Sequence, residues 1–272
     1  MRVAEEIRGE LLKAEERASD LRSMLLELEG ADEGLSPVPA AAFLTEDLSF
    51  EWLVKGLIPA GTTGMLSANP SAGKTTLITQ LMAQAAAGQS FMGHPVPSPV
   101  RCLYVSAEGS RAAYQERFRT ALRVLRINPE EIPWYIHPGR WDRFDFSVGL
   151  SDLVAMTNKV SARLIVLDTL GYFYCGDEND STEWKRKAMV PLRRLTRETG
   201  AACVIVHHHG KNDDYRGTSA MRGDLDFMFR LDAPPETPNL REFWVTKHKY
   251  AAMGYSIRLK FDPIHAFFEE DL

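Results

Sequence analysis

The chain has 272 residues, a formal net charge of −5 and 44% hydrophobic residues. This composition is typical of a globular protein and excludes a wholly basic nucleic-acid binder, although it permits a locally basic channel. No apolar stretch approaches the roughly 18 residues that a membrane-spanning helix requires, so we expect a cytoplasmic protein with no membrane partner. The three cysteines have no metal-ligand spacing, which indicates reduced thiols.

Residues 1–30 carry a heptad pattern that predicts an amphipathic N-terminal helix. Apolar residues recur at alternating spacings of three and four over about four heptads, and charged residues flank them. The apolar positions are Ala4, Ile7, Leu11, Ala14, Ala18, Leu21, Leu25 and Leu28. Such a helix packs either on its own subunit or on a neighbouring one. Both interpretations stay open, because alanine is a small knob for a coiled coil.

Residues 31–48 predict a linker, because Gly34, Pro37 and Pro39 interrupt any regular element. In residues 49–272, strand patterns alternate with helical patterns, which predicts right-handed parallel crossovers. The expected strands cover residues 63–68, 101–106, 134–137, 163–168 and 201–207, and the expected helices cover residues 73–87, 109–125, 150–159 and 182–199. Further strands follow at residues 226–231, 243–249 and 255–261. We therefore predict an α/β three-layer sandwich with a mainly parallel central sheet and a C-terminal antiparallel extension.

A short segment of small residues follows the first of these strands and precedes the first helix. It consists of Asn69, Pro70, Ser71, Ala72, Gly73, Lys74, Thr75 and Thr76. Strand, loop and helix in this order predict a phosphate-binding loop, because backbone N–H groups and the helix dipole converge on one polyanion. In such a loop Lys74 reaches the β- and γ-phosphates of ATP, and the Thr75 hydroxyl ligates Mg²⁺. Ala68 replaces the usual first glycine, so we expect a negative φ there.

Two carboxylates follow buried strands and complete the expected chemistry. Asp168 ends a run of four apolar residues, where it would hold Mg²⁺ or a water of the metal. Glu108 follows another apolar strand and precedes a glycine, which makes it the candidate base for the attacking water.

Three consecutive histidines, His207, His208 and His209, follow a third strand. Adjacent residues on a strand point to opposite faces, so the three cannot ligate one metal ion without a turn. A polar residue at this strand end is better placed to sense the γ-phosphate through a hydrogen bond.

The order of these motifs resembles the RecA-like ATPases of the plasmid RepA hexameric-helicase type. The resemblance covers residues 50–261. It rests on the phosphate-binding loop and on five later segments, which are residues 107–109, 167–170, 177–180, 206–211 and 216–220. It implies a RecA-like fold, a ring with ATP between subunits, and His208 as the γ-phosphate sensor. It also implies that segments after Gly171 and His209 face the central pore.

The resemblance further implies that a basic pair near the C-terminal strands reaches the γ-phosphate of the neighbouring subunit. Lys247 and Lys249 match that spacing, and two residues two positions apart on a strand share one face. Their charge would neutralise the transferring phosphoryl group. The alternative is a solvated basic edge strand, since charged edges also prevent aggregation.

These expectations lead to an Mg²⁺-dependent ATPase that forms a ring, six-membered by the resemblance, and moves along single-stranded DNA during replication of a plasmid, phage or mobile element. Lys211, Arg216 and Arg222 would place positive charge in the pore loop, where phosphate contacts are independent of sequence. One alternative is a recombinase or annealing-type DNA-binding ATPase. Another is a nucleotide-gated interaction module whose N-terminal helix recruits a partner protein.

Overall fold

A computed structural model of the chain describes residues 37–46, 50–106, 110–137, 146–208 and 219–271. The predicted N-terminal helix, Glu108, His209, Lys211 and Arg216 lie outside the described residues. The chain divides into two compact units, Met1–Ser49 and Phe50–Leu272. In the first unit, helix α2 (Ala40–Phe43) lies within the predicted linker segment. Pro39 directly precedes this turn, a position that tolerates proline because no helical N–H is lost.

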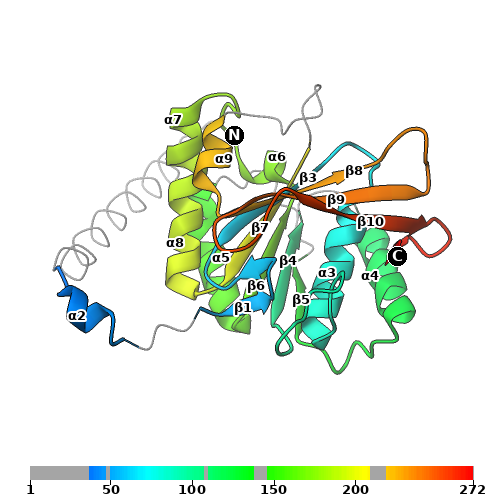
Figure 1. Cartoon of the computed structure of the whole chain (residues 1–272), viewed down its shortest axis with the longest axis horizontal. Coiled ribbons are helices and arrows are strands. Elements are labelled where there is room, and N and C mark those ends of the chain that lie inside the picture. The colour runs from blue at the N-terminus through cyan, green and yellow to red at the C-terminus, as the bar shows by residue number, and fades with distance from the viewer. Residues whose placement is uncertain (1–36, 47–49, 107–109, 138–145, 209–218, 272) are drawn as a thin grey trace, which may run out of the picture. The chain divides into compact units, whose positions relative to one another are not determined.

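The second unit is built on a nine-stranded sheet with the order β11-β10-β9-β8-β3-β7-β6-β4-β5. Strands β3 to β8 run parallel, and β9, β10 and β11 continue the sheet in antiparallel fashion. The bounds are β3 (Thr63–Ala68), β4 (Cys102–Ser106), β5 (Trp134–His137), β6 (Leu164–Asp168), β7 (Ala202–His208), β8 (Phe227–Asp232), β9 (Leu240–His248), β10 (Tyr255–Asp262) and β11 (Phe267–Glu270). The predicted fold is thus confirmed (Figure 1).

Helices cover both faces of the sheet, because the central strands are apolar on both sides. Alternate residues of one strand enter different cores: Val166 and Val204 belong to one, Ile165 and Cys203 to the other. Helices α3 (Lys74–Ala87) and α4 (Arg111–Leu125) pack into the first core. The second core takes α5 (Phe146–Val160), α6 (Leu170–Phe173), α7 (Ser181–Trp184), α8 (Val190–Thr199) and α9 (Ser219–Asp224). Figure 1 shows the two groups of helices on either side of the sheet.

Two details of the prediction were wrong. The expected helix over residues 182–199 is interrupted by a π-helical turn at Lys185–Met189, because Pro191 follows and cannot donate a helical hydrogen bond. The short pair β1 (Trp52–Val54) and β2 (Ile58–Pro59) was not predicted, and neither was β11. Within the described residues, no helix combines the length and the apolar character needed to cross a membrane.

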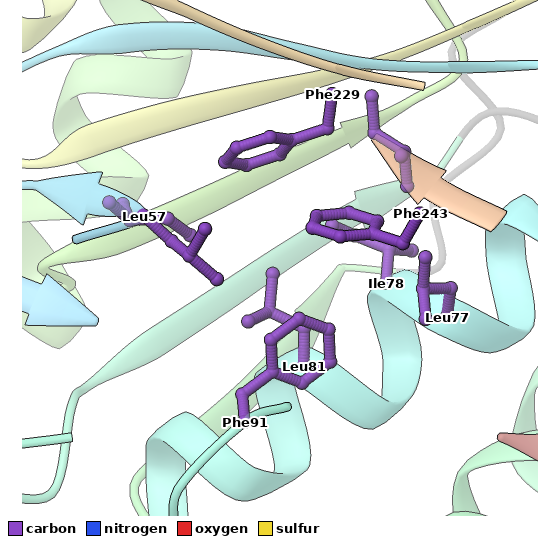
Figure 2. Close-up of a pocket in the computed structure, with 9 residues that line it drawn as sticks. Leu57, Leu77, Ile78, Leu81, Phe91, Phe229 and Phe243 are labelled. Atoms are coloured by element: carbon purple, nitrogen blue, oxygen red, sulfur yellow. The ribbon is translucent and has the colours of Figure 1, made fainter. Parts of the chain in front are cut away.

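Helix α3, which starts at the phosphate-binding loop, rests directly on the sheet. Leu77, Ile78 and Leu81 face Phe229 of β8 and Phe243 of β9 around a cavity of about 10 Å³ (Figure 2). All nine lining side chains are apolar, and the volume is about that of one water molecule, so the cavity is a packing gap and not a ligand site. This contact fixes the helix N-terminus relative to β8 and β9.

Candidate nucleotide-binding site

Residues 69–73 join β3 to α3 in a tight loop with left-handed backbone positions. Ser71 has a φ of 65° and Gly73 a φ of 100°. Backbone turns that alternate in this way direct successive N–H groups to one side and form concave anion sites. Ala68 is fully buried at the end of β3 and is absent from the residues with positive φ, as its replacement of the usual glycine predicted.

Helix α3 begins directly after the loop, and no side chain caps its first backbone N–H groups. Gly73 is the N-cap residue, and the first turn contains no acidic residue. Lys74, Thr75 and Thr76 form the first helical positions. The backbone N–H groups of the first turn, the helix dipole and the Lys74 charge fit a polyphosphate, and the Thr75 hydroxyl is a suitable oxygen ligand for Mg²⁺.

Asp168 ends β6 and is only 1% exposed. The Tyr104 hydroxyl donates a 2.5 Å hydrogen bond to Asp168 Oδ2. Burial, and then the negative charge of Asp168, raise the pKa of Tyr104 well above its ordinary value, so the phenol stays protonated and keeps donating. Such a donor holds the carboxylate in one orientation, which suits a metal-side ligand. Sequence analysis missed Tyr104, although a tyrosine within a buried apolar strand regularly signals a polar partner.

The carboxyl ends of the parallel strands bring the predicted site residues to one edge of the sheet. His208 on β7 lies beside Ala68, the last residue before the phosphate-binding loop. Asp168 on β6 lies beside Val206, and Ser106 at the end of β4 lies beside Asp168. The strand that leads to Glu108 therefore ends next to Asp168, as open α/β sheets require of their ligand sites.

The two described histidines of the triple differ in burial. His207 is 2% exposed, and its Nε2 lies 3.9 Å from Glu178 Oε2, whereas His208 is half-buried. Within the described residues, no group of histidine, cysteine and acidic side chains is arranged to hold a metal ion. The different burial of His207 and His208 agrees with the alternation expected of neighbouring strand residues.

The C-terminal strand β11 packs against the phosphate-binding loop. A Cβ atom at Gly73 would lie 2.7 Å from Cζ of Phe268 on β11, so only glycine fits at this positive φ. Gln80 of α3 fixes Phe268 through two hydrogen bonds: its Nε2 donates to Phe268 O at 2.9 Å, and its Oε1 accepts from Phe268 N at 3.0 Å. The antiparallel extension thereby becomes part of the loop's surroundings.

Lys247 and Lys249 lie at the opposite edge of the sheet. Residue Phe227, which starts β8, pairs with His248, and it also pairs with Gly64 near the start of β3. Lys247 Nζ donates to the carbonyls of Arg222 and Gly223, the latter at 3.0 Å. Lys249 Nζ forms a 2.8 Å ion pair with Asp226. Burial, and then the charge of Lys249, lower the pKa of Lys247.

Lys247 is the penultimate residue of β9, and Lys249 lies one residue beyond the strand end at His248, so the shared face of the two lysines stays a prediction. The register between β8 and β9 shifts between Met228 and Phe229, opposite Lys247 and Val245, so the irregularity precedes both lysines. A register shift of this kind changes the side-chain alternation locally. The two lysines are nevertheless close in the chain and both remain on the edge far from the phosphate-binding loop.

Arg222 belongs to α9 and not to a loop, so its predicted location was wrong. Met221 is fully buried in the second core, and this burial stabilises the short helix despite Gly223. The exposed Arg222 donates to Thr246 O at 3.4 Å, which places it beside Lys247. Its contact with nucleic acid remains a prediction.

Aromatic side chains surround the far edge near these cations. Phe50 is 51% exposed and Tyr250 is 47% exposed, and their ring centroids are 5.0 Å apart. Phe50 also contacts Trp52, whose ring lies 5.7 Å from that of His248. Sequence analysis did not find this cluster, because its members are separated by nearly the whole second unit.

The fold, the phosphate-binding loop and the strand-end aspartate together define a RecA-like P-loop ATPase. The model of the AAA_25 family, described as an AAA domain, matches residues 31–214, and the chain belongs to this family. No curated protein matches the chain in sequence. Among the solved structures, the RadB recombinase is similar with a TM-score of 0.54 and 18% identity, over 77% of this chain and 90% of that one. At this identity, the similarity shows the fold alone.

Proposed function

We propose that the chain is an Mg²⁺-dependent ATPase that assembles into a ring, a hexamer by its family resemblance, and moves along single-stranded DNA. Such an activity serves the replication of a plasmid, phage or mobile element. It takes place in the cytoplasm together with a partner protein. The observation that carries the proposal is the separation of two sets of charged residues on opposite edges of one sheet. Lys74 and Asp168 occupy one edge, and Lys247 and Lys249 occupy the other.

The separation supports a role of the two lysines at the nucleotide of a neighbouring subunit and not at their own. Five steps of about 3.3 Å lead from Thr63 to Ala68, so the two edges lie roughly 16 Å apart, farther than a lysine side chain reaches. A cation placed in this way serves a nucleotide only when the nucleotide belongs to a neighbouring subunit. The ion pair of Lys249 with Asp226 is partly exposed and therefore weak, so it opens at little cost.

Each residue then has a defined task. The loop N–H groups and Lys74 bind the phosphates, and Thr75 and Asp168 hold Mg²⁺, which supplies charge neutralisation for the phosphoryl transfer when it is bound. Glu108 accepts the proton of the attacking water, and His208 hydrogen-bonds the γ-phosphate and reports its loss to the segment that follows. Lys211 and Arg216 in that segment, together with Arg222, contact DNA phosphates.

A second candidate is a recombinase or annealing-type ATPase, because the family and the fold are equally compatible with this function. The similar solved structure is named a recombinase, and the exposed aromatic rings of Phe50 and Tyr250 suit base stacking in a filament as well as a subunit contact. A nucleotide-gated interaction module is the third candidate, and it would need no ordered assembly.

Particle mass and electron microscopy separate the three. The full chain is measured with Mg²⁺ and a non-hydrolysable ATP analogue, with and without single-stranded DNA. Closed rings that hydrolyse ATP faster on DNA are expected for the motor, and open filaments for the recombinase. A monomer that binds ATP but never assembles would overturn both and favour the interaction module.

A further inference from the structure

Arg241, the second residue of β9, is a buried cation directly behind the phosphate-binding loop. Its side chain is 8% exposed, and Nε donates a 2.9 Å hydrogen bond to Ala72 O in the loop. Nη1 donates to Pro238 O and Leu240 O, both at 2.7 Å, and the guanidinium stacks 5.2 Å from the ring centre of Phe261. All of its hydrogen-bond partners are neutral carbonyls.

No carboxylate in the described part of the chain pairs with Arg241. Burial alone lowers its pKa, and an arginine stays charged even so. A buried charge without a counter-ion is costly, and an apolar side chain of similar length would fill the same space at lower cost. Packing therefore does not explain why the position carries an arginine.

The hydrogen bond to Ala72 also determines the direction of the next N–H group. In a trans peptide, the carbonyl of one residue and the N–H of the following residue point in opposite directions. Because Arg241 holds Ala72 O toward the protein interior, the N–H of Gly73 turns toward the open side of the loop. That side is where a phosphate has to lie.

We propose that Arg241 is a positioning residue of the phosphate site: it orients the peptide between Ala72 and Gly73 and supplies the positive charge that the phosphates of the nucleotide neutralise. This inference rests on the proposed ATP binding. It explains the buried unpaired cation, because a bound polyphosphate becomes its missing partner across the loop. Phe268 holds Gly73 from the same extension, so both contacts act on one short segment.

The test compares Arg241→Met with Arg241→Lys in the full chain. Methionine keeps the length of the side chain and removes the charge together with the hydrogen bonds to three carbonyls, so Tm is measured beside Kd to separate the two effects. Lysine keeps the charge but not the planar hydrogen-bonding geometry. Arg258→Gln is the matched control, because Arg258 lies on neighbouring β10 with a side chain that is 63% exposed.

Kd for a fluorescent ATP analogue and Tm without nucleotide are measured for all proteins. We expect Arg241→Met to bind at least about 10-fold more weakly, which corresponds to about 1.4 kcal/mol, with a Tm close to that of the wild type. Arg241→Lys should recover part of this loss, and Arg258→Gln should match the wild type. In Arg241→Met the affinity for the ATP analogue should therefore change more than the stability. A purely structural role of Arg241 would not produce this difference.

Three results would overturn the assignment. The first is an Arg241→Met protein whose Kd lies within about 3-fold of the wild type, and the second is an Arg241→Met protein that binds weakly because its Tm falls so far that it is no longer folded. The third is an Arg241→Lys protein whose Kd is as high as that of Arg241→Met. Failure of the proposed function looks different. In that case the wild type itself binds no ATP analogue, and Lys74→Ala behaves as the wild type does.

Discussion

The parallel half of the sheet and its antiparallel extension use their strand ends differently. In the parallel half, the functional residues follow the carboxyl ends of β3, β6 and β7, and all of them gather at one edge. In the extension, β9 runs the other way, so its first residues meet the phosphate-binding loop and its last residue lies beside Lys247 and Lys249. One antiparallel strand thus connects a subunit's own nucleotide site with the surface proposed to serve its neighbour.

The largest expected effect comes from breaking the parallel half. Lys74→Ala should abolish tight ATP binding, because it removes the side-chain charge that faces the terminal phosphates at the start of α3. Equilibrium titration with a fluorescent ATP analogue measures this loss, and circular dichroism verifies the fold. Retained tight binding by a folded Lys74→Ala protein would show that the loop is not the nucleotide site.

Replacement of Lys249, at the end of the extension far from the phosphate-binding loop, should give the next largest effect. Lys249→Ala should lower the steady-state ATPase rate about 10³-fold, the scale of a cation supplied in trans to phosphoryl transfer, with little change in ATP affinity. Lys260→Ala on β10 is the control, because Lys260 is exposed and lies on the neighbouring strand. Equal rates for the two variants would return Lys249 to the role of a solvated charge.

Glu108→Gln should bind ATP nearly normally and hydrolyse it about 10²-fold more slowly, which is the scale of a lost general base. Single-turnover hydrolysis with saturating ATP measures the chemical step. A variant with wild-type turnover would mean that another carboxylate is the base.

Mixing Glu108→Gln with Lys249→Ala then tests whether the two regions act across subunits. Some interfaces in the mixed assembly combine an intact Glu108 with an intact Lys249 from the next subunit, so activity should reappear. Single-stranded DNA should increase the recovered rate, and rising salt should reduce this stimulation because phosphate contacts release counter-ions. Absence of recovery between subunits that exchange would contradict catalysis in trans.

The two regions also differ in how far their sequence predicted them. The parallel strands have strong signals, because they are buried on both faces: residues 163–168 were expected and β6 covers Leu164–Asp168. Asp168 and the loop residues follow from such strands at once. The extension is amphipathic and its pairing depends on distant residues, so the contact of β11 with Gln80 of α3 had no local signal.

Single charged residues in the extension illustrate the limit. Arg241 looks like any surface arginine in the sequence, and only the tertiary structure buries it against Ala72. The register shift that directly precedes Lys247 depends on the pairing of β9 with β8. The location of Arg222 in α9 depends on the burial of Met221, a tertiary effect that outweighs the low helix propensity of Gly223.

The smallest expected effect concerns His248, which ends β9 between the two lysines. Its side chain is 7% exposed, its Nδ1 accepts a 3.1 Å hydrogen bond from Tyr250 N–H, and its Nε2 lies 3.0 Å from Leu57 O. The ring is therefore neutral with the hydrogen on Nε2. Burial lowers the pKa of His248 below its ordinary value of 6.5.

A lowered histidine pKa has a definite sign for stability. The unfolded chain takes up a proton near pH 6.5, and the folded chain resists it until the pH falls further. The free energy of unfolding should therefore decrease as the pH falls below 6.5, by at most about 1.4 kcal/mol per pH unit for one proton, and level off below the folded pKa. His248→Gln should remove this contribution, while every other titrating group cancels in the difference between the two proteins. Urea unfolding of both proteins from pH 8 to pH 5 measures it. Parallel stability curves would show that protonation of His248 is not coupled to the packing of β9 against Leu57 and Tyr250, and that the outward end of the extension is held by other contacts.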